Sequence, residues 1–536
     1  MNPRRTGTRV VAGAAATTLW LTAFTGAAAP AQAGLLGSLL GTVVGVVDTT
    51  TTLLVDTVNG LLSPTGWIVE DGVTELDHVS TVIGADRLRN RGYDGRGVGV
   101  ALIDTGVAPV NGLNSGNVVN GPDLSFESQS DEYRYLDTFG HGTHMAGIIA
   151  GDEPSTLLGG QRFQGIAPGA RLTSLKVAST EGAVDVSQVI AAIDWVVAHR
   201  NDDPRNPIRV LNLSYGTDGV QGYRSDPLTH AVENAWRAGI VVVVAAGNNG
   251  TSNPKLNNPA YDPYVLAVGA SDTGGTVGAS DDLVPDFSSR GDSSRRVDLV
   301  APGRSIASLR VPGSYVDEAH PSARVGDRFF KGSGSSQAAA VVSGAVALLL
   351  DSRPDLRPDE VKKLLRASAE DMPLADTAGR GQGELDIYRA FLRATPDATQ
   401  SWPRSTGLGS LERARGSQHV EDDGVALTGE RHVLGPFDGD IWAPASASFS
   451  AWDGGAWAGR DWTSGCWCES SWSGKSWAGK SWAGKSWAGK SWADHAWSGK
   501  SWAGKSWAGK SWADYGWVGK SWAGKSWAGK SWASAG

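Results

Sequence analysis

Four short stretches of the chain carry side chains that serine-based catalysis requires. An apolar run ends in Asp104, within IDTGV, and His141 opens the stretch GHGTHMAGIIAG. Asn248 follows another apolar run, within AAGNNG, and Ser336 lies in GSGSSQAAAVVSG. A serine is unreactive without a base beside it, so Ser336 alone indicates nothing. An acid, a base, a nucleophile and an amide donor together are what serine-based catalysis needs, provided that the fold brings them into contact.

Each of these residues also has an ordinary structural interpretation. An aspartate before Thr-Gly commonly caps a turn, and a histidine at the start of an Ala/Gly-rich helix is commonly structural. His144 follows His141 by three positions and raises the question of an H-x-x-H metal site. Zinc hydrolase motifs need a glutamate between spaced histidines and further ligands, which Gly142 and Thr143 do not supply. We therefore predict no metal ligand among these residues.

Ser336 directly precedes the apolar helical pattern QAAAVVSGAVALLL. At the N-terminus of that helix, unpaired backbone N–H groups and the helix dipole would favour a developing negative charge. The G-x-S-x-G elbow of α/β-hydrolases is absent, because neither Ser335 nor Ser336 has a glycine two residues away on both sides. The chain order Asp104, His141, Asn248, Ser336 is instead the order of the subtilisin triad with its oxyanion asparagine.

Strand patterns alternate with helical patterns in the part of the chain that contains these residues. The runs at 98–103, 208–213, 240–246 and 265–270 are short and rich in β-branched residues, as is typical of parallel strands buried on both faces. Helical patterns lie between them at 186–200 and 225–239. We expect an α/β fold with a doubly wound parallel sheet, in which ligands bind beyond the carboxyl ends of the strands.

From about Val79 to Leu392 the chain resembles the subtilisin-like (subtilase) serine proteases. IDTGV resembles the aspartate motif of that family, GHGTHMAG its histidine motif and GSGSSQAAAVVSG its serine motif, while LNLSYG and AAGN resemble its substrate-lining strand and oxyanion loop. The chain departs from the family at Ser335 (usually Thr), Gln337 (usually Met) and Ala340 (usually Pro). Without that proline, the start of the nucleophile's helix is expected to be less rigidly set.

The resemblance implies a peptidase domain at 79–393 with these roles: catalytic Asp104, His141 and Ser336; oxyanion donor Asn248; and substrate-binding Ser214, Tyr215, Gly216, Ala245, Ala246 and Gly247. The small residues at 245–247 would wall a pocket for an apolar or aromatic side chain. Ser333 and Ser335 would only form loop hydrogen bonds. No cofactor is expected for the chemistry. Structural calcium is common in the family, but no ligand cluster could be assigned to it.

The N-terminal residues resemble an export signal. A basic start, an apolar run and an Ala-x-Ala site ending at Ala33 predict a signal peptide at 1–33. Residues 34–78 are interpreted as a leader or short propeptide. The amphipathic pattern at 34–62 also fits an interfacial segment, and a poorly ordered leader fits it equally well. No uncharged apolar span of 18 residues follows the signal, so no transmembrane segment is expected in the mature chain. Cys466 and Cys468 cannot make a disulfide framework.

The C-terminal part is a tail in which tryptophan recurs at every fifth position from Trp452 to Trp532, with the unit S-W-A-G-K. We assign 394–440 to a linker region and 441–536 to this tail. A helix or a single strand would scatter the rings, because neither has a period of five. Three-residue strands joined by two-residue turns would place the rings on one face, and a solenoid coil is a second model. A disordered low-complexity tail is the third.

The tail is rich in lysine although the whole chain has a formal net charge of −8. Aromatic rings interleaved with cations suit cell-wall polysaccharide or anionic polymers, and self-association through the rings is the alternative. No nucleic acid is expected as a partner of an exported protein. The sequence therefore predicts a secreted, extracellular and wall-associated endopeptidase that acts on polypeptides. The competing hypothesis is a surface-binding or structural protein whose protease domain is slow or only processes itself.

Overall fold

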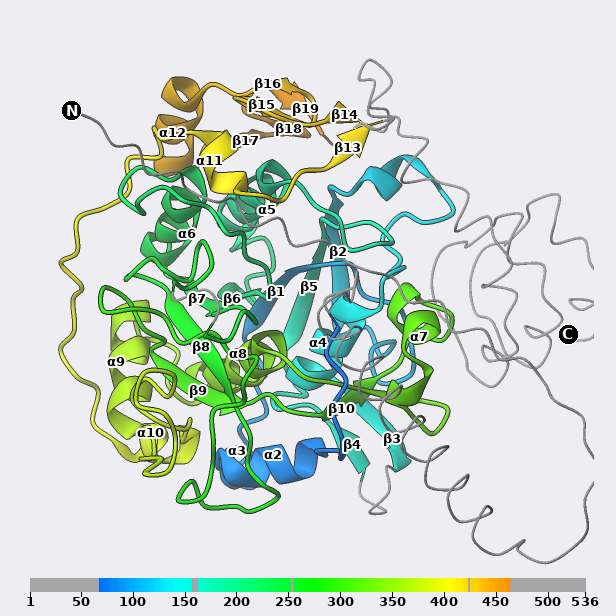
Figure 1. Cartoon of the computed structure of the whole chain (residues 1–536), viewed down its shortest axis with the longest axis vertical. Coiled ribbons are helices and arrows are strands. Elements are labelled where there is room, and N and C mark those ends of the chain that lie inside the picture. The colour runs from blue at the N-terminus through cyan, green and yellow to red at the C-terminus, as the bar shows by residue number, and fades with distance from the viewer. Residues whose placement is uncertain (1–66, 157–161, 252–254, 423–424, 463–536) are drawn as a thin grey trace, which may run out of the picture. The chain divides into compact units, whose positions relative to one another are not determined.

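The computed structural model describes residues 67–156, 162–251, 255–422 and 425–462 (Figure 1). The predicted signal peptide, most of the expected leader, Cys466, Cys468 and the tail beyond Trp462 lie outside the described residues. All described residues belong to one structural unit, which begins at Thr65.

A seven-stranded sheet forms the centre of this unit, and every pair of neighbouring strands in it is parallel (Figure 1). The strand order is β2-β5-β1-β6-β7-β8-β9. The bounds are Gly99–Asp104 (β1), Val118–Asp123 (β2), Arg171–Lys176 (β5), Ile208–Leu213 (β6), Val241–Ala245 (β7), Leu266–Ser271 (β8) and Leu299–Pro302 (β9). The predicted doubly wound α/β fold is confirmed, because β1, β6, β7 and β8 coincide with the four predicted runs.

Helices cover both faces of the sheet. The helices α4 (His141–Ala150) and α8 (Ser335–Ser352) pack together against one face, and α5 (Val186–His199) and α6 (Pro227–Arg237) pack together against the other (Figure 1). Side chains start both α5 and α6: Asp185 forms a capping box with Gln188, and Asp226 accepts from two N–H groups of the first turn of α6. The elements α2 (Leu76–Val82), α3 (Ala85–Arg89), α9 (Pro358–Ser368) and α10 (Ile387–Leu392) lie around this centre.

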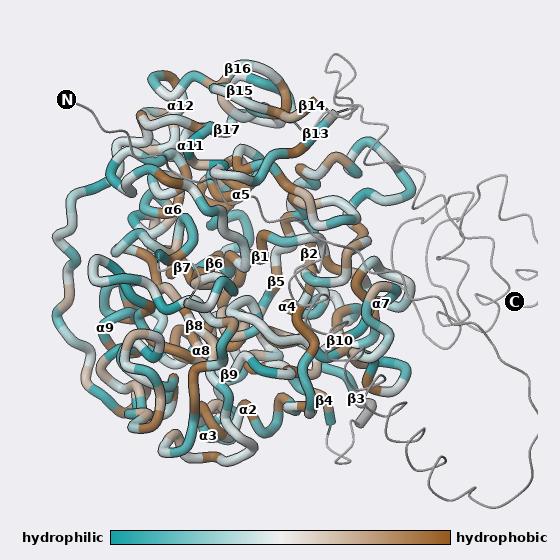
Figure 2. Tube along the Cα trace, in the orientation of Figure 1, coloured by the Kyte–Doolittle hydropathy of each residue, from teal (hydrophilic) through white to brown (hydrophobic). Residues whose placement is uncertain are grey.

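The core is continuous along the sheet, and Figure 2 shows the apolar residues concentrated in its strands and in α8. Among the described helices, α8 is the one that is long and apolar enough to cross a membrane, and most of it is buried within the protein. Smaller elements complete the unit: β3 (Asp152–Thr156), β4 (Arg162–Gln164), β10 (Ile306–Leu309), β11 (Arg324–Val325), β12 (Phe329–Gly332), α7 (Tyr315–Ala319), η1 (Phe126–Gln129) and η2 (Pro321–Ala323).

The region expected to be a linker packs against the peptidase core. It contains α11 (Leu411–Arg415), four two-residue strands and the start of α12 (Gly439–Ala447); the strands are β13 (Glu421–Asp422), β14 (Val425–Ala426), β15 (Arg431–His432) and β16 (Gly435–Pro436). The Arg415 side chain is fully buried and pairs with Asp185, the N-cap of α5, at 2.6 Å. The expected boundary at residue 393 therefore falls inside a packed unit, since a buried arginine must stay with its carboxylate.

The first tail pentads form short antiparallel strands, β17 (Trp452–Asp453), β18 (Ala456–Trp457) and β19 (Arg460–Asp461), joined by two-residue turns. Trp452 lies directly opposite Trp457. The rings point toward α5 rather than to solvent: Trp452 donates its indole N–H to the Ala191 carbonyl oxygen at 2.7 Å, and Trp457 donates its indole N–H to Asp194 Oδ2 at 2.8 Å. Over the described pentads the structure is thus the short-strand alternative, with its rings buried on one side.

Candidate active site

Asp104 and His141 are in direct contact at the carboxyl end of β1. His141 is the first residue of α4, and its Nδ1–H donates to Asp104 Oδ1 at 2.7 Å. The Asp104 carboxylate is buried, and Oδ1 also accepts from the backbone N–H of Thr105 at 2.8 Å. An imidazole whose Nδ1 carries the proton presents an unprotonated Nε2, which is the form that acts as a base.

A buried clamp holds His141 at this distance. Thr105 Oγ1 donates to Asp137 Oδ1 at 2.7 Å and accepts from the Gly142 N–H at 2.8 Å. The other oxygen of Asp137 accepts from the Thr143 N–H at 2.7 Å. A Cβ at Gly142 would lie 2.1 Å from the Gly106 carbonyl oxygen, so only glycine lets the helix start this close to β1.

The electrostatic surroundings give the two histidines different properties. Burial lowers the pKa of His141, but the charge and hydrogen bond of Asp104 and the charge of Asp137 outweigh it, and the net shift is upward. Burial and the neighbouring His141 lower the pKa of His144 to about 3. His144 Nε2–H donates to the carbonyl oxygens of Ile306 (3.2 Å) and Phe330 (3.0 Å). His144 is therefore a neutral structural residue.

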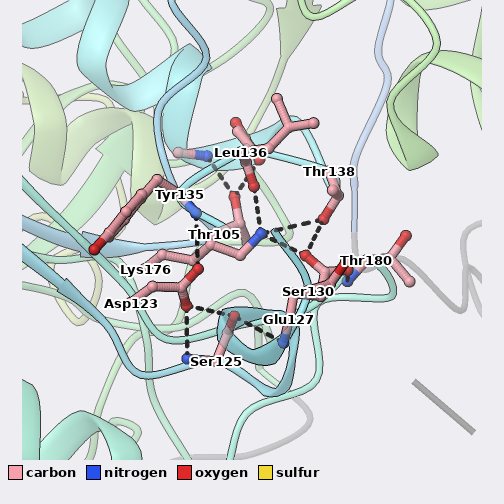
Figure 3. A network of polar contacts seen from close by, with 12 residues as sticks. Thr105, Asp123, Ser125, Glu127, Ser130, Tyr135, Leu136, Thr138, Lys176 and Thr180 are labelled. Atoms are coloured by element: carbon pink, nitrogen blue, oxygen red, sulfur yellow. Dashed lines mark hydrogen bonds and ion pairs between the residues drawn. The ribbon is translucent and has the colours of Figure 1, made fainter. Parts of the chain in front are cut away.

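A buried lysine supports the same region from the neighbouring strand (Figure 3). Lys176 ends β5 in register with Asp104, and its Nζ contacts the Glu127 carboxylate and the Leu136 carbonyl oxygen. Thr138 Oγ1 donates to the same carboxylate at 2.8 Å. Burial raises the pKa of Glu127, and the Lys176 charge opposes that shift. The network fixes the segment that leads into Asp137, and sequence reasoning had not identified it.

Ser336 is the second residue of α8, where the sequence predicts it, and it is half-buried. Hydrogen bonds to neighbouring loops hold the serines that precede it. Ser335 donates from its backbone N–H (2.9 Å) and from Oγ (3.0 Å) to Asn248 Oδ1, and Ser333 Oγ accepts from the Ser305 N–H at 2.8 Å. The Asn248 side chain is exposed, and both bonds engage its oxygen. The amide nitrogen is thus the end of that side chain which remains to serve as a donor.

The expected substrate-binding residues lie on two neighbouring loops that follow β6 and β7. Ser214, Tyr215 and Gly216 are half-buried after β6, and Ser214 Oγ donates to the Ser336 carbonyl oxygen at 3.4 Å. Ala245 and Ala246 are buried at the end of β7, and Gly247 follows.

Asn257 connects these two loops, and the sequence carried no signal for it. A Cβ at Gly216 would lie 2.8 Å from Asn257 Cβ, and a Cβ at Gly247 would lie 2.8 Å from Asn257 Cγ. The side chain of Asn257 therefore lies between the two expected pocket walls. It is fixed there by a bond from Asn249 Nδ2 to its Oδ1 at 2.8 Å.

Trp67, from the end of the expected leader, contacts the histidines of this site. Its ring lies perpendicular to that of His141, with 5.8 Å between the ring centroids. The centroid of the His144 ring lies 5.0 Å from it.

The described residues contain no group of three or more His, Cys, Asp or Glu side chains suited to hold a metal. A cavity of about 680 Å³ lies elsewhere, lined by cations that include Arg224, Arg295 and Arg366. It includes none of the expected catalytic residues.

Comparison with known proteins adds to this geometry. A family model described as the Subtilase family matches residues 95–409, more than half of the chain. Serine protease AprX of Bacillus subtilis (strain 168) is 38% identical over 322 residues, which are 59% of this chain and 70% of AprX. Subtilisin DY of Bacillus licheniformis is 32% identical over 311 residues, 58% of this chain and 96% of that protein. A solved structure that this chain also matches is the crystal structure of fervidolysin from Fervidobacterium pennivorans, a keratinolytic enzyme related to subtilisin. The two sequences are 29% identical and the TM-score is 0.47, over 59% of this chain and 45% of that chain.

Proposed function

The chain belongs to the subtilase family and is a subtilisin-like serine protease, and from that premise we propose that it is a secreted endopeptidase that cuts polypeptides through an acyl-enzyme on Ser336. The observation that carries this assignment is the 2.7 Å hydrogen bond from His141 Nδ1–H to buried Asp104. The second support is Asn248, whose oxygen is held by the residue directly before Ser336.

The proposed roles follow from these contacts. His141 Nε2 takes the proton of Ser336 as Oγ attacks the peptide carbonyl carbon, and Asp104 stabilises the imidazolium that forms. The oxyanion accepts hydrogen bonds from Asn248 Nδ2 and from the Ser336 N–H at the start of α8. His141 then returns the proton to the leaving amine, and water hydrolyses the ester by the same route. No cofactor enters these steps.

The substrate would lie beside β6 as an added strand, paired with residues 214–216. The side chain before the scissile bond would then enter between 214–216 and 245–247, where the small walls suit an apolar or aromatic group. Asn257 adds an amide between those walls and would limit the depth of the pocket. Structural calcium stays a proposal for which we assign no ligands.

Export and the tail complete the proposal. The N-terminal signal at 1–33 would direct the chain out of the cell, and the repeated tryptophan and lysine residues beyond Trp462 would bind wall polysaccharide or an anionic polymer, or associate with one another. The competing function, a surface-binding protein with a slow or self-processing protease domain, is favoured by that repeat alone. A tail segment expressed by itself would retain wall binding under both hypotheses, so hydrolysis of other proteins decides between them.

The deciding experiment compares casein hydrolysis by the purified protein, by Ser336→Ala and by Ser333→Ala. We expect the first variant to abolish hydrolysis and the second to retain most of it, because the bond lost with the Ser333 side chain is one accepted from the Ser305 N–H within the loops. Hydrolysis that survives Ser336→Ala would overturn the assignment of the nucleophile. A folded protein with no hydrolysis would favour the binding function.

A further inference from the structure

The cavity of about 680 Å³ is lined by α9, by the segment that leads into β9 and by the loop at 219–224, which follows the expected substrate-pairing residues 214–216. Its volume is in the usual range of small-molecule sites. Six cationic and two acidic side chains line it, so the lining has a formal charge of +4. The cations are Arg224, Lys255, Arg295, Arg296, Lys362 and Arg366, and the acids are Asp292 and Asp298. A concave volume surrounded by charges of one sign attracts ions of the other sign.

This positive charge contrasts with the charge of the rest of the protein. Beyond Trp462, ten lysines stand against three acidic residues, so residues 1–462 carry a formal net charge of −15. The cations of the cavity are therefore gathered on a body that is otherwise acidic. The tail is itself cationic and would be repelled by the cavity, so the occupant must be an anion from outside the chain.

Three cations of the lining share one carboxylate. An oxygen of Asp298 lies 2.8 Å from Arg295 Nη2, and oxygens of the same carboxylate lie 3.5 Å from Lys362 Nζ and 3.5 Å from Arg366 Nε. Burial lowers the pKa of Lys362 to about 8; the charges of Arg295 and Arg366 add to that shift and the charge of Asp298 opposes it. The cluster therefore holds more positive charge than its own carboxylate balances.

Several groups of the lining have the placement that a ligand needs. Arg295 Nε is buried and has no hydrogen-bond acceptor among the described residues, which costs free energy that a ligand oxygen would recover. Arg224 and Arg366 are exposed. Lys362 and Arg366 are four residues apart on α9, so they lie on the same face of that helix. Trp402 adds an indole that is 54% exposed.

We propose that this cavity is a binding site for a small polyanion, a molecule with two or more phosphate or carboxylate groups close together. Guanidinium groups bind both kinds of oxyanion through paired N–H donors. One negative charge does not balance the lining, so a singly charged ion should bind poorly. The bound anion would connect the loop at 219–224 to α9. The lining contains none of the catalytic residues, so this site goes beyond the proposed peptidase function.

Calorimetric titration of the full-length Ser336→Ala protein tests the site, with inorganic pyrophosphate, citrate and acetate as probes. All buffers contain EDTA, so that removal of a metal ion by a probe is not mistaken for binding. We expect pyrophosphate or citrate to bind and to raise the melting temperature, and acetate to do neither. Binding of pyrophosphate alone would identify a phosphate ligand, and binding of citrate alone a carboxylate ligand.

Substitutions of exposed cations locate the bound anion. Arg224→Gln and Arg366→Gln should each weaken binding at least about 10-fold, because each removes a charged donor from the lining. Arg205→Gln is the matched control: its side chain is 91% exposed and lies outside the lining, so this variant should bind the anion as tightly as its parent.

Three results would overturn the proposal. The first is a folded protein that binds neither pyrophosphate nor citrate. The second is binding that Arg224→Gln and Arg366→Gln leave unchanged, which would place the anion elsewhere. The third is binding that Arg205→Gln weakens as much as they do, which would show a response to surface charge in general. Casein hydrolysis by the protein with Ser336 intact is measured separately, and its absence would refute the peptidase function without affecting this site.

Discussion

The Arg415 guanidinium and the Asp185 carboxylate form an ion pair, with 2.6 Å between Nε and Oδ2 and neither side chain exposed. Asp185 caps α5, so the pair joins the segment after residue 393 to the sheet-covering helices. Removing one partner of a buried pair leaves an uncompensated charge. We predict that Arg415→Ala lowers the free energy of unfolding by about 3–5 kcal/mol. Urea unfolding in the Ser336→Ala background measures it. Arg413→Ala, at an exposed neighbouring position, should change it by less than about 0.5 kcal/mol.

Asp194 in α5 also contacts α12 and the first tail pentads, since its carboxylate accepts hydrogen bonds from Trp442 and Ser446 of α12 and from Trp457 of β18. A chain that ends at residue 393 would lack the elements that pack on α5 and α6, and their apolar side chains would be exposed to water. Each fully buried aromatic side chain contributes about 1.5–3 kcal/mol. We predict that this chain is insoluble or melts far below the full-length protein, whereas a chain ending at residue 462 melts close to it. Equal melting temperatures for the two truncations would contradict the packing described here.

The pH dependence of hydrolysis should follow His141. Catalysis needs the neutral imidazole, and the pKa of His141 is raised above its usual 6.5 because Asp104 and Asp137 outweigh the effect of burial. The acid limb of kcat/KM should therefore have its midpoint above pH 6.5. Asp104→Asn should move that midpoint downward and lower kcat by about 10⁴-fold. A pH–rate profile on a peptide ester checks both, and a midpoint that the variant leaves unchanged would show that another group controls the limb.

Asn248 and Ser335 should act together on turnover rather than on binding. Removing one oxyanion donor costs about 10²–10³ in kcat, so we predict that fall for Asn248→Ala, with KM nearly unchanged. Ser335→Ala removes one of the two bonds that orient the amide, together with the bond that Ser335 Oγ accepts from the Gly247 N–H, and should cost less. Combined, the two substitutions should be little worse than Asn248→Ala alone, because Ser335 acts through Asn248. Additive losses would assign Ser335 a role of its own.

Two buried carboxyl groups away from the site predict a stability effect. Burial raises the pKa of Glu384 to about 8 and that of Asp282 to about 7, and the neighbouring acids add to both shifts. The folded state then holds protons that the unfolded chain releases near pH 4, so stability should fall as the pH rises from about 4 to about 8. In the Ser336→Ala background, Glu384→Gln should make stability depend less on pH, whereas Asp131→Asn, at an exposed position, should leave that dependence unchanged. Melting temperatures measured between about pH 4 and about pH 8 test this prediction.

Sequence patterns predicted the parts of this molecule that depend on local periodicity. The β-branched runs gave β1, β6, β7 and β8, and the apolar pattern after Ser336 gave α8. The clustering of Asp104 with His141 followed from chain order and the resemblance to subtilases. β5 was not predicted, because polar residues interrupt its apolar ones and it ends in Lys176, whose burial depends on its contacts with Glu127 and the Leu136 carbonyl oxygen.

Long-range contacts account for what the sequence did not reveal. In the sequence, Arg415 and Asp194 are indistinguishable from ordinary surface charges. Their partners, Asp185 and Trp442, lie more than two hundred residues away along the chain and reach them only in the folded protein. Trp67 lies in a stretch with no strand pattern, and its ring packs against side chains that lie far from it along the chain. Asn257 acquires its place only because Gly216 and Gly247 converge on it. No local pattern encodes such contacts, since each partner is set by the fold.

Labelling with a fluorophosphonate, followed by peptide mapping, tests the central claim most directly, because that reagent reacts only with a serine activated by a neighbouring base. We predict one phosphonylated residue, Ser336, in the folded wild-type protein, and no label after denaturation or in His141→Ala. A folded protein that stays unlabelled, or carries its label on another serine, would contradict the assignment of Ser336, His141 and Asp104 as one catalytic unit.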